Sequence, residues 1–169
     1  MGKITHLQML VSFKTKKRMK IVDFSDTYLP QMASIFVTEY SEPERKWNVE
    51  TAIAYLRKNI VSNPEYCKVA VTDTDEFMGG ICCRIDPYYS GSLLFIDSLE
   101  VDRQYRHHGV GTELLKNVVA TAKQNGVDQI HFLGDSRKGF PKAWYQELGF
   151  IETGWVEYEM STDKLQFKK

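Results

Sequence analysis

The stretch Leu99–Leu115, LEVDRQYRHHGVGTELL, decides the fold of this chain. An apolar segment ends in it, a basic loop with two closely spaced glycines follows, and a helical pattern begins. A helix that starts after such a loop points free main-chain N–H groups and the positive end of its dipole at an anion. Gly109 and Gly111 let the backbone approach that anion without an intervening Cβ. The stretch therefore predicts a strand, a phosphate-binding loop and a helix, with Arg103 and Arg106 adding positive charge.

Two short motifs indicate which class of phosphate site this is. The loop has neither the Gly-Lys-Ser/Thr of a P-loop nor the third glycine of a Rossmann fingerprint. Arg106-x-x-Gly109-x-Gly111 instead resembles the Q/R-x-x-G-x-G/A motif of the GNAT superfamily of acetyl-CoA-dependent N-acetyltransferases. Residues 144–150, WYQELGF, resemble the Y-x-x-L-G-F motif of the same family. The resemblance covers the acetyl-CoA-binding half of the family, here residues 92–160, and extends to the preceding residues only in the order of their elements.

The periodicity of apolar residues predicts an α/β domain with the element order β-α-α-β-β-β-α-β-α-β, which is the GNAT order. The resemblance implies a mixed, mostly antiparallel sheet with helices on both faces. It also implies that the two central strands, before and after the helix that follows the loop, splay apart. Asp86-Pro87 is expected to end the third strand, and 88–91 to form a loop. Strands are predicted over 20–24, 66–72, 77–85, 93–101 and 129–133, and one or two final strands are predicted within 150–160. Helices are predicted over 25–40, between Asn48 and Asn63, and over 109–124 and 141–148.

The composition excludes several classes of protein. Lys and Arg total 22 and Asp and Glu total 22, so the bulk charge favours neither a nucleic-acid partner nor a membrane surface. No apolar run approaches the ~20 residues of a membrane span. The three cysteines lack C-x-x-C spacing and no histidine has ligand spacing with them, so we expect free thiols in a reducing cytoplasm and no metal site. Basic residues gather in 1–18, which we expect to be a flexible leader before a domain over 19–169.

Acetyl transfer to an amine requires a base for the amine proton, a donor to the thioester oxygen and an acid for the leaving thiolate. The resemblance implies that Tyr145 is that acid, the alternative being a packing role. Asp97 is the first candidate for the base, because it interrupts an apolar strand on the same side as Leu99 and Val101 by the period of two. The alternative for Asp97 is an ion pair within the fold. Glu100 is the rival base, and the same alternation places it on the opposite face.

The resemblance also implies the residues that contact acetyl-CoA. The main chain of 99–101 is expected to pair with the pantetheine amides, with the Val101 N–H on the acetyl oxygen. The pyrophosphate is expected at the N–H groups of residues 106–112. Lys138 stands where the family often has asparagine, and it can meet a cofactor phosphate instead. The expected contact residues are Leu99, Glu100, Val101, Arg106, His107, His108, Gly109, Val110, Gly111, Thr112, Lys138 and Tyr145.

The sequence therefore predicts an N-acetyltransferase that moves an acetyl group from acetyl-CoA to a primary amine by direct attack. The alternative is a non-catalytic acyl-CoA-binding module. Acids and aromatics before the fourth strand suit a cationic acceptor, and both a small-molecule amine and a peptidyl amine remain open. We expect a cytoplasmic protein without nucleic-acid or membrane partners, and a homodimer is left open. The acceptor-side residues are Glu39, Tyr40, Glu42, Glu44, Trp47, Tyr88 and Tyr89.

Overall fold

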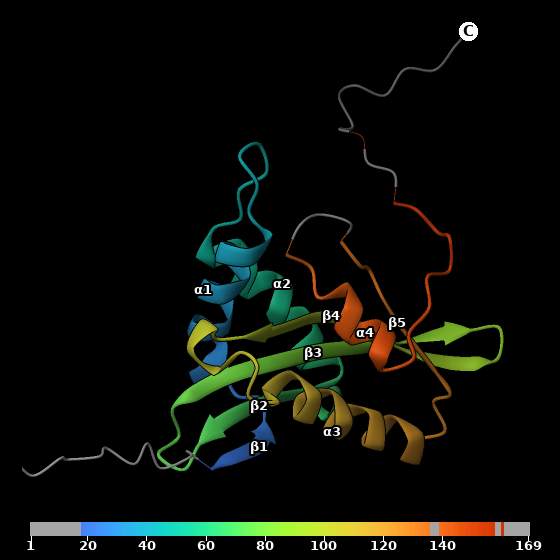
Figure 1. Cartoon of the computed structure of the whole chain (residues 1–169), viewed down its shortest axis with the longest axis horizontal. Coiled ribbons are helices and arrows are strands. Elements are labelled where there is room, and N and C mark those ends of the chain that lie inside the picture. The colour runs from blue at the N-terminus through green and yellow to red at the C-terminus, as the bar shows by residue number, and fades with distance from the viewer. Residues whose placement is uncertain (1–17, 136–138, 158–159, 161–169) are drawn as a thin grey trace, which may run out of the picture. The chain divides into compact units, whose positions relative to one another are not determined.

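A computed structural model describes residues 18–135, 139–157 and 160 of the chain. Two compact units make it up, one ending at Leu133 and the other beginning at Gly134. The first unit is built on a five-stranded sheet in the spatial order β1-β2-β3-β4-β5 (Figure 1). Only β4 and β5 run parallel, and the other neighbouring pairs are antiparallel. The strands are β1 Met19–Asp23, β2 Cys67–Thr72, β3 Phe77–Tyr88, β4 Gly91–Val101 and β5 Gln129–Phe132.

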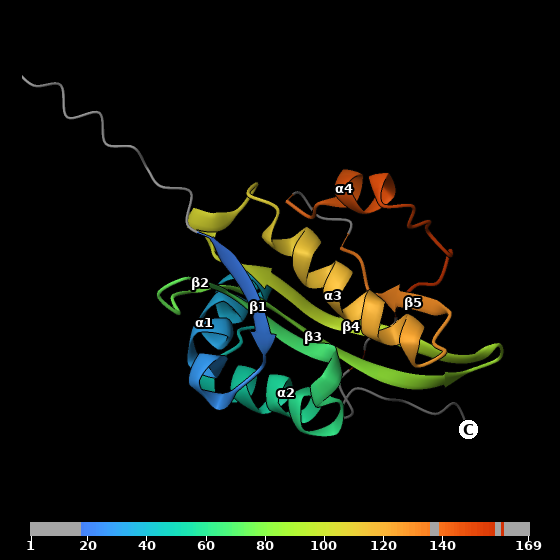
Figure 2. The same cartoon turned by 90° about the horizontal axis from the view of Figure 1, so that it is seen from below.

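Helices cover both faces of this sheet, as predicted. The pair α1 (Leu29–Tyr40) and α2 (Val49–Ser62) lies on one face, and α3 (Val110–Gln124) lies on the other (Figure 2). The α1 and α2 face buries apolar side chains of both helices against β2 and β3. Short 3-10 turns connect these elements at Asp26–Tyr28, Pro64–Tyr66 and Arg103–Tyr105. This mixed α/β arrangement confirms the predicted fold class.

The start of α2 shows how the local sequence sets a boundary. The Asn48 side chain accepts a hydrogen bond from the Thr51 N–H at 2.8 Å, and the Thr51 hydroxyl accepts one from the Asn48 N–H at 3.2 Å. This reciprocal capping box satisfies two donors that the helix leaves unpaired. Asn48 was predicted as this cap from sequence alone.

The central strands splay as predicted. β4 pairs with β5 only from Leu93 opposite Gln129 to Ile96 opposite Phe132. From Asp97 to Val101, β4 therefore has a partner only on its β3 side among the described residues of this unit. The second half of β4 thus presents one unpaired main-chain edge.

The third strand is longer than predicted. β3 continues through Pro87 to Tyr88, which closes a hairpin with Gly91. Pairing with β2 stops at Cys82, so β3 has an open outer edge beyond it among the described residues. Hydrogen-bonded and non-bonded pairs alternate along this antiparallel ladder, starting from the bonded closing pair of Tyr88 and Gly91. The Pro87 nitrogen therefore points toward the open edge, where the lack of an N–H donor breaks no ladder hydrogen bond. The prediction that Asp86-Pro87 ends the strand was therefore wrong.

The second unit contains the short helix α4, Lys142–Glu147. The Tyr145 ring packs on Phe140, Trp144 and Phe150, with centroids 5.4, 4.6 and 5.6 Å away. The predicted final strand is absent from the described residues 150–157 and 160. Apolar alternation gives a strand only where a partner edge is available, and Trp155 is 89% exposed. The rest of that predicted segment lies outside the described residues.

Candidate active site

The loop before α3 forms a cradle, which we define as residues 106–112. Gly109 adopts a φ of +83° as the N-cap of α3, and His107 also has a positive φ, +63°. Glu113 is the residue whose N–H bonds back to the Gly109 carbonyl, at 3.0 Å. The N–H groups of Val110 to Thr112 precede that bond and have no partner within the helix. A Cβ added at Gly109 would meet no protein atom within 4 Å, so the cradle opens onto free space of the kind that a phosphate needs.

Two side chains of the cradle bond to the protein itself. Arg106 Nε donates to the Val101 carbonyl at 3.0 Å, and Arg106 Nη2 donates to Glu39 Oε1 at 2.9 Å. His108 Nδ1 donates to the Arg106 carbonyl at 2.7 Å. The Arg106 guanidinium is therefore held at two points, and the anion contacts predicted for the cradle fall to its main chain.

The free edge of β4 adjoins this cradle in the chain. The Asp102 N–H donates to the Met78 carbonyl at 2.9 Å. Because bonded pairs alternate along an antiparallel ladder, the main-chain groups of Leu99 and Val101 point away from β3. On that side β5 has already diverged. No other strand of the described unit faces these groups, and the pantetheine contacts expected of them stay a prediction.

A glycine of β3 permits this packing. A Cβ added at Gly79 would lie 2.6 Å from the Glu100 carbonyl oxygen and 3.3 Å from a Val110 methyl group. The first contact is shorter than van der Waals separation and involves backbone that cannot rotate away. Glycine at 79 therefore lets the end of β4 and the start of α3 approach β3 closely.

A β-bulge brings two carboxylates to one face of the sheet. The register of β3 on β4 shifts so that Cys82 and Cys83 face Ser98 and Ile96, which leaves Asp97 as the extra residue. Asp97 accepts a hydrogen bond from Tyr55 of α2 at 3.2 Å. Glu100 is opposite Gly80, where an added Cβ would meet Met32 of α1 at 2.7 Å. Both carboxylates thus lie on the α1 and α2 face.

The predicted separation of Asp97 and Glu100 was therefore wrong. Strict alternation puts residues three apart on opposite faces, but the bulge adds one residue and cancels the difference. Val101 and Leu99 were predicted on the Asp97 side and lie on the α3 side instead, since Val101 is opposite Gly79.

Asp97 is held by partners. Its Oδ1 forms an ion pair with the Arg84 guanidinium in addition to the Tyr55 bond, and its side chain is 4% exposed. Burial raises the pKa of Asp97, and the Arg84 charge and the Tyr55 hydrogen bond oppose that rise. Arg84 also bonds Asp86 at 2.9 Å and lies 4.0 Å above the Phe95 ring. The predicted alternative, an ion pair within the fold, describes this geometry.

Glu100 is in a different electrostatic state. It is 3% exposed, and neither carboxylate oxygen has a hydrogen bond within normal geometry. Burial raises the pKa of Glu100 to about 8, and the nearby hydroxyl groups of Ser98 and Tyr40 only partly offset this rise. Near neutral pH the side chain therefore holds a proton in much of the population.

Aromatic side chains surround these carboxylates on the helical face. The Tyr55 hydroxyl meets Asp97, and burial together with the Asp97 charge raises the pKa of Tyr55 to about 12. The Phe36 ring stacks on Tyr40 at 4.5 Å and meets the edge of Trp47 at 4.9 Å. Tyr55 is thus a hydrogen-bond donor rather than a base, in a largely apolar surrounding that suits a cationic amine.

The structure brings together only some of the predicted site residues. Tyr88 and Tyr89 lie at the hairpin loop, at the opposite end of β4 from Glu100. Lys138 lies outside the described residues. Tyr145 is 8% exposed within the second unit, in aromatic packing that fits its alternative role. No group of three or more side chains able to hold a metal occurs in the described part of the chain.

Sequence reasoning did not single out Arg84 or Tyr55. It named Glu39 as an acceptor-side residue but not as the partner of Arg103 and Arg106. Arg84 carried a usable signal, because it is a cation within the otherwise apolar run of β3. The partners of Tyr55 and Glu39 lie 42 and 67 residues away in sequence, which no local pattern can reveal.

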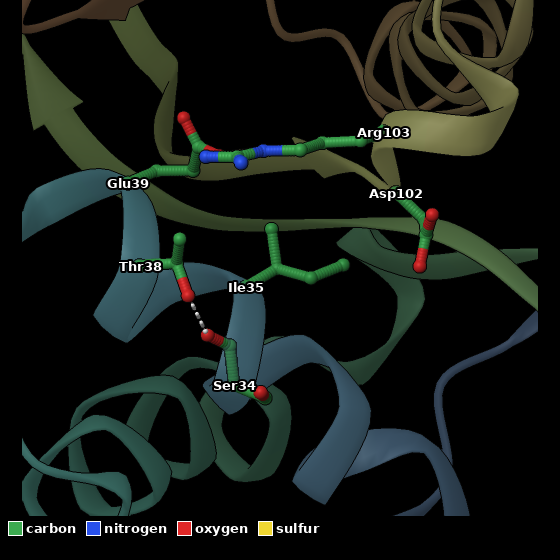
Figure 3. Close-up of a pocket in the computed structure, with 6 residues that line it drawn as sticks. All are labelled: Ser34, Ile35, Thr38, Glu39, Asp102 and Arg103. Atoms are coloured by element: carbon green, nitrogen blue, oxygen red, sulfur yellow. Dashed lines mark hydrogen bonds and ion pairs between the residues drawn. The ribbon is translucent and has the colours of Figure 1, made fainter.

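A shallow pocket of about 230 Å³ flanks the cradle side of α1. Figure 3 shows its six lining residues, with the Glu39 carboxylate directed at the Arg103 guanidinium. The lining residues are Ser34, Ile35, Thr38, Glu39, Asp102 and Arg103.

Comparison with known proteins agrees with the family resemblance found in the sequence motifs. The acetyltransferase (GNAT) family profile matches residues 29–150. N-alpha-acetyltransferase 30 of Schizosaccharomyces pombe is 27% identical over 132 residues, covering 77% of this chain and 82% of that protein. N-alpha-acetyltransferase 50 of Danio rerio is 30% identical over 99 residues, covering 57% and 58%. The chain spans 33% of the length of human N-alpha-acetyltransferase 30, at 25% identity.

Solved structures share the fold. The aminoglycoside N-acetyltransferase AAC(6')-Iy in complex with CoA has a TM-score of 0.69 at 17% identity, covering 86% of this chain and 96% of that one. Arabidopsis thaliana Naa50 in complex with the bisubstrate analogue CoA-Ac-MVNAL has a TM-score of 0.57 at 21% identity, covering 78% and 82%.

The chain belongs to the GNAT acetyltransferase family. It is an acetyl-CoA-dependent N-acetyltransferase that transfers the acetyl group to an amine. The prediction of an enzyme is thereby confirmed, and nothing in the comparisons favours the non-catalytic module. Among the described residues, no helix has the length and apolar character of a membrane span.

Proposed function

We propose that this enzyme acetylates the α-amino group of a peptide or protein N-terminus, by direct attack of the amine on the acetyl-CoA thioester. The relatives named N-alpha-acetyltransferase support this choice of acceptor. The observation that carries it is Glu100, a buried carboxylate whose oxygens have no hydrogen bond within normal geometry. Within this proposal residues 19–169 form the catalytic domain and residues 1–18 precede it. Three buried free cysteines suit a cytoplasmic location.

The pKa of Glu100 favours an α-amine over a lysine side chain. An α-ammonium has a pKa of about 8 and a lysine ammonium about 10.4. Proton transfer to Glu100, with a pKa of about 8, is then nearly level for the α-amine. For lysine it is uphill by roughly 2.4 pKa units, or about 3 kcal/mol. Glu100 is therefore our choice of base, acting directly or through water, and Asp97 is a structural partner of Arg84.

The free edge of β4 and the cradle would bind acetyl-CoA. The Val101 N–H points to the unpaired side and would donate to the thioester oxygen, where charge builds up during attack. The main chain of Leu99 would pair with the pantetheine arm. The N–H groups at the start of α3 would hold the pyrophosphate, and a Lys138 contact to a phosphate would add to them.

Tyr145 completes the proposed reaction as the acid that protonates the departing thiolate. Its phenol hydroxyl carries a proton that it can donate to the thiolate, and the position of Tyr145 in the Y-x-x-L-G-F motif supports this role. Tyr145→Phe removes only the hydroxyl, so turnover should fall while CoA affinity and the melting temperature stay near the wild-type values. Unchanged turnover would leave Tyr145 with a packing role.

The acceptor assignment is tested by measuring CoA thiol release with short peptides that differ in their first residue. Each peptide is paired with its Nα-acetylated form, which keeps any lysine side chain but lacks the α-amine. An aminoglycoside forms a third arm. We expect release with free N-termini and none with the blocked peptides. Turnover of the blocked, lysine-containing peptides or of the aminoglycoside alone would refute the α-amine assignment.

A further inference from the structure

The end of α1 is tied to the cradle by a shared carboxylate. Glu39 lies one residue before the end of α1, and its Oε1 accepts from Arg106 Nη2 at 2.9 Å and from Arg103 Nη2 at 3.2 Å. Burial would raise the pKa of Glu39, but these two arginines outweigh it and hold the pKa below its usual value. The carboxylate is therefore ionised throughout the neutral range.

Arg106 also bonds to the free edge of β4, so that it links Glu39 to this strand. Its Nε donates to the Val101 carbonyl at 3.0 Å. That carbonyl belongs to the half of β4 that no strand of the described unit covers on this side. The guanidinium thus bridges Glu39 of α1 and Val101 of β4 with two donors in one rigid plane. The N–H of Val101 belongs to the same residue, so any rotation of this peptide segment is opposed by the bridge.

We propose that Glu39 and Arg106 form a brace that positions the end of β4 for acetyl transfer, and that Arg106 acts chiefly through Val101 rather than as a phosphate ligand. Both are positioning residues. The inference rests on the proposed function only in assigning the Val101 N–H to the acetyl oxygen. The structural part of the inference, that the brace restrains residues 99–106, does not depend on the proposed function.

Charge and geometry separate the brace from a phosphate contact. A phosphate ligand needs the positive charge of Arg106, which lysine would retain. A brace needs the planar fork, because a single ammonium cannot reproduce donors at Glu39 and Val101 in the same geometry. Arg106→Lys therefore distinguishes the two roles, and Arg106→Gln removes both the charge and the fork.

The first experiment measures kcat at saturating acetyl-CoA and the Kd of CoA for Arg106→Lys, Arg106→Gln and Glu39→Gln. We expect kcat to fall about tenfold in each, less than loss of an oxyanion donor costs, while Kd changes by less than about threefold. Arg57→Gln is the matched control, since it removes an exposed arginine–carboxylate pair, 3.2 Å from Asp26, away from β4. A Kd that rises tenfold in Arg106→Gln, is restored in Arg106→Lys and leaves kcat intact would overturn the brace.

The second experiment needs no acceptor, so it separates failure of the brace from failure of the proposed acceptor. Hydrogen exchange is followed over residues 99–106 in the CoA complex. Because local opening sets the exchange rate, Glu39→Gln and Arg106→Lys should speed exchange there at least about threefold, with Arg57→Gln matching the wild type. Unchanged exchange in both brace variants would refute the proposal, whatever acceptor the enzyme uses.

Discussion

The two halves of β4 show how one strand can serve two purposes. Before the bulge, Leu93–Ile96 pairs with β3 on one side and β5 on the other. After it, Leu99–Val101 has only β3 as a strand partner among the described residues. The carboxylates follow the same division, because Asp97 at the bulge has an arginine and a tyrosine as partners, whereas Glu100 beyond it has none within hydrogen-bond geometry. The paired half thus holds a carboxylate with partners, and the open half holds the groups to which our proposal assigns the chemistry.

The sharpest test of this contrast is Glu100→Gln, which removes the base and keeps the shape. Turnover should fall by about 10² or more, the usual contribution of a general base. The loss should shrink above pH 8, because an α-amine then arrives already neutral. A pH profile of kcat/KM for both forms provides the measurement. A constant loss at every pH would move the base elsewhere.

The same residue predicts an unusual dependence of stability on pH. Glu100 has a folded pKa of about 8 and an unfolded pKa near 4.3. Between these values the unfolded chain binds fewer protons at this site, so stability falls as pH rises, by up to about 1.4 kcal/mol per unit. Urea unfolding at pH 5.5 and 7.5 should show Glu100→Gln gaining on the wild type at the higher pH. An equal difference at both values would contradict the buried, partnerless state of Glu100.

A pair of neighbouring glycines tests how closely the open half must pack. A methyl group at Gly79 would meet the Glu100 carbonyl at 2.6 Å, while one at Gly80 would meet the flexible end of Met32 at 2.7 Å. Gly79→Ala should therefore lower stability by about 1–3 kcal/mol and reduce turnover as well. Gly80→Ala should cost less, since Met32 can change rotamer. Equal losses would show that the position of β4 is not fixed by this contact.

The smallest effect on catalysis is expected from Asp97→Asn in the paired half. Turnover should fall by only about threefold, with the pH profile unchanged in shape, because Arg84 rather than a substrate holds this carboxylate. Thermal unfolding should show a clearer loss, since Arg84 then lacks its buried partner. A pH-dependent loss larger than that of Glu100→Gln would reverse the assignment of the base.

Local signals in the sequence were sufficient for most of the fold. Asn48 correctly predicted the start of α2, and the glycines of the cradle correctly predicted the start of α3. Such local predictions succeed because caps and turn residues act on their immediate neighbours. The end of β3 was misjudged, since whether Pro87 is tolerated depends on which edge of the strand has a partner. The facing of Glu100 was misjudged for a similar reason. A bulge is a property of two paired strands, and nothing in β4 alone marks Asp97 as the extra residue.

The candidate site divides in the same way. Its residue types and the positions of the two motifs could be read from the sequence. The state of each group could not, because an ion pair with Arg84 or its absence distinguishes Asp97 from Glu100. The contacts of Asp97 with Arg84 and Tyr55 join residues 13 and 42 positions apart in the sequence.

The proline near the tip of the β3–β4 hairpin has a consequence for association between copies of the chain. Beyond Cys82 the outer edge of β3 has no strand partner among the described residues, and unpaired strand edges are how sheets aggregate. The Asn63 side chain accepts a hydrogen bond from the Ile85 N–H at 3.2 Å, which occupies one donor of this edge. Pro87 removes a donor from that edge, and the Arg84–Asp86 pair places charge beside it. A continuous intermolecular sheet is therefore disfavoured at this edge of the hairpin.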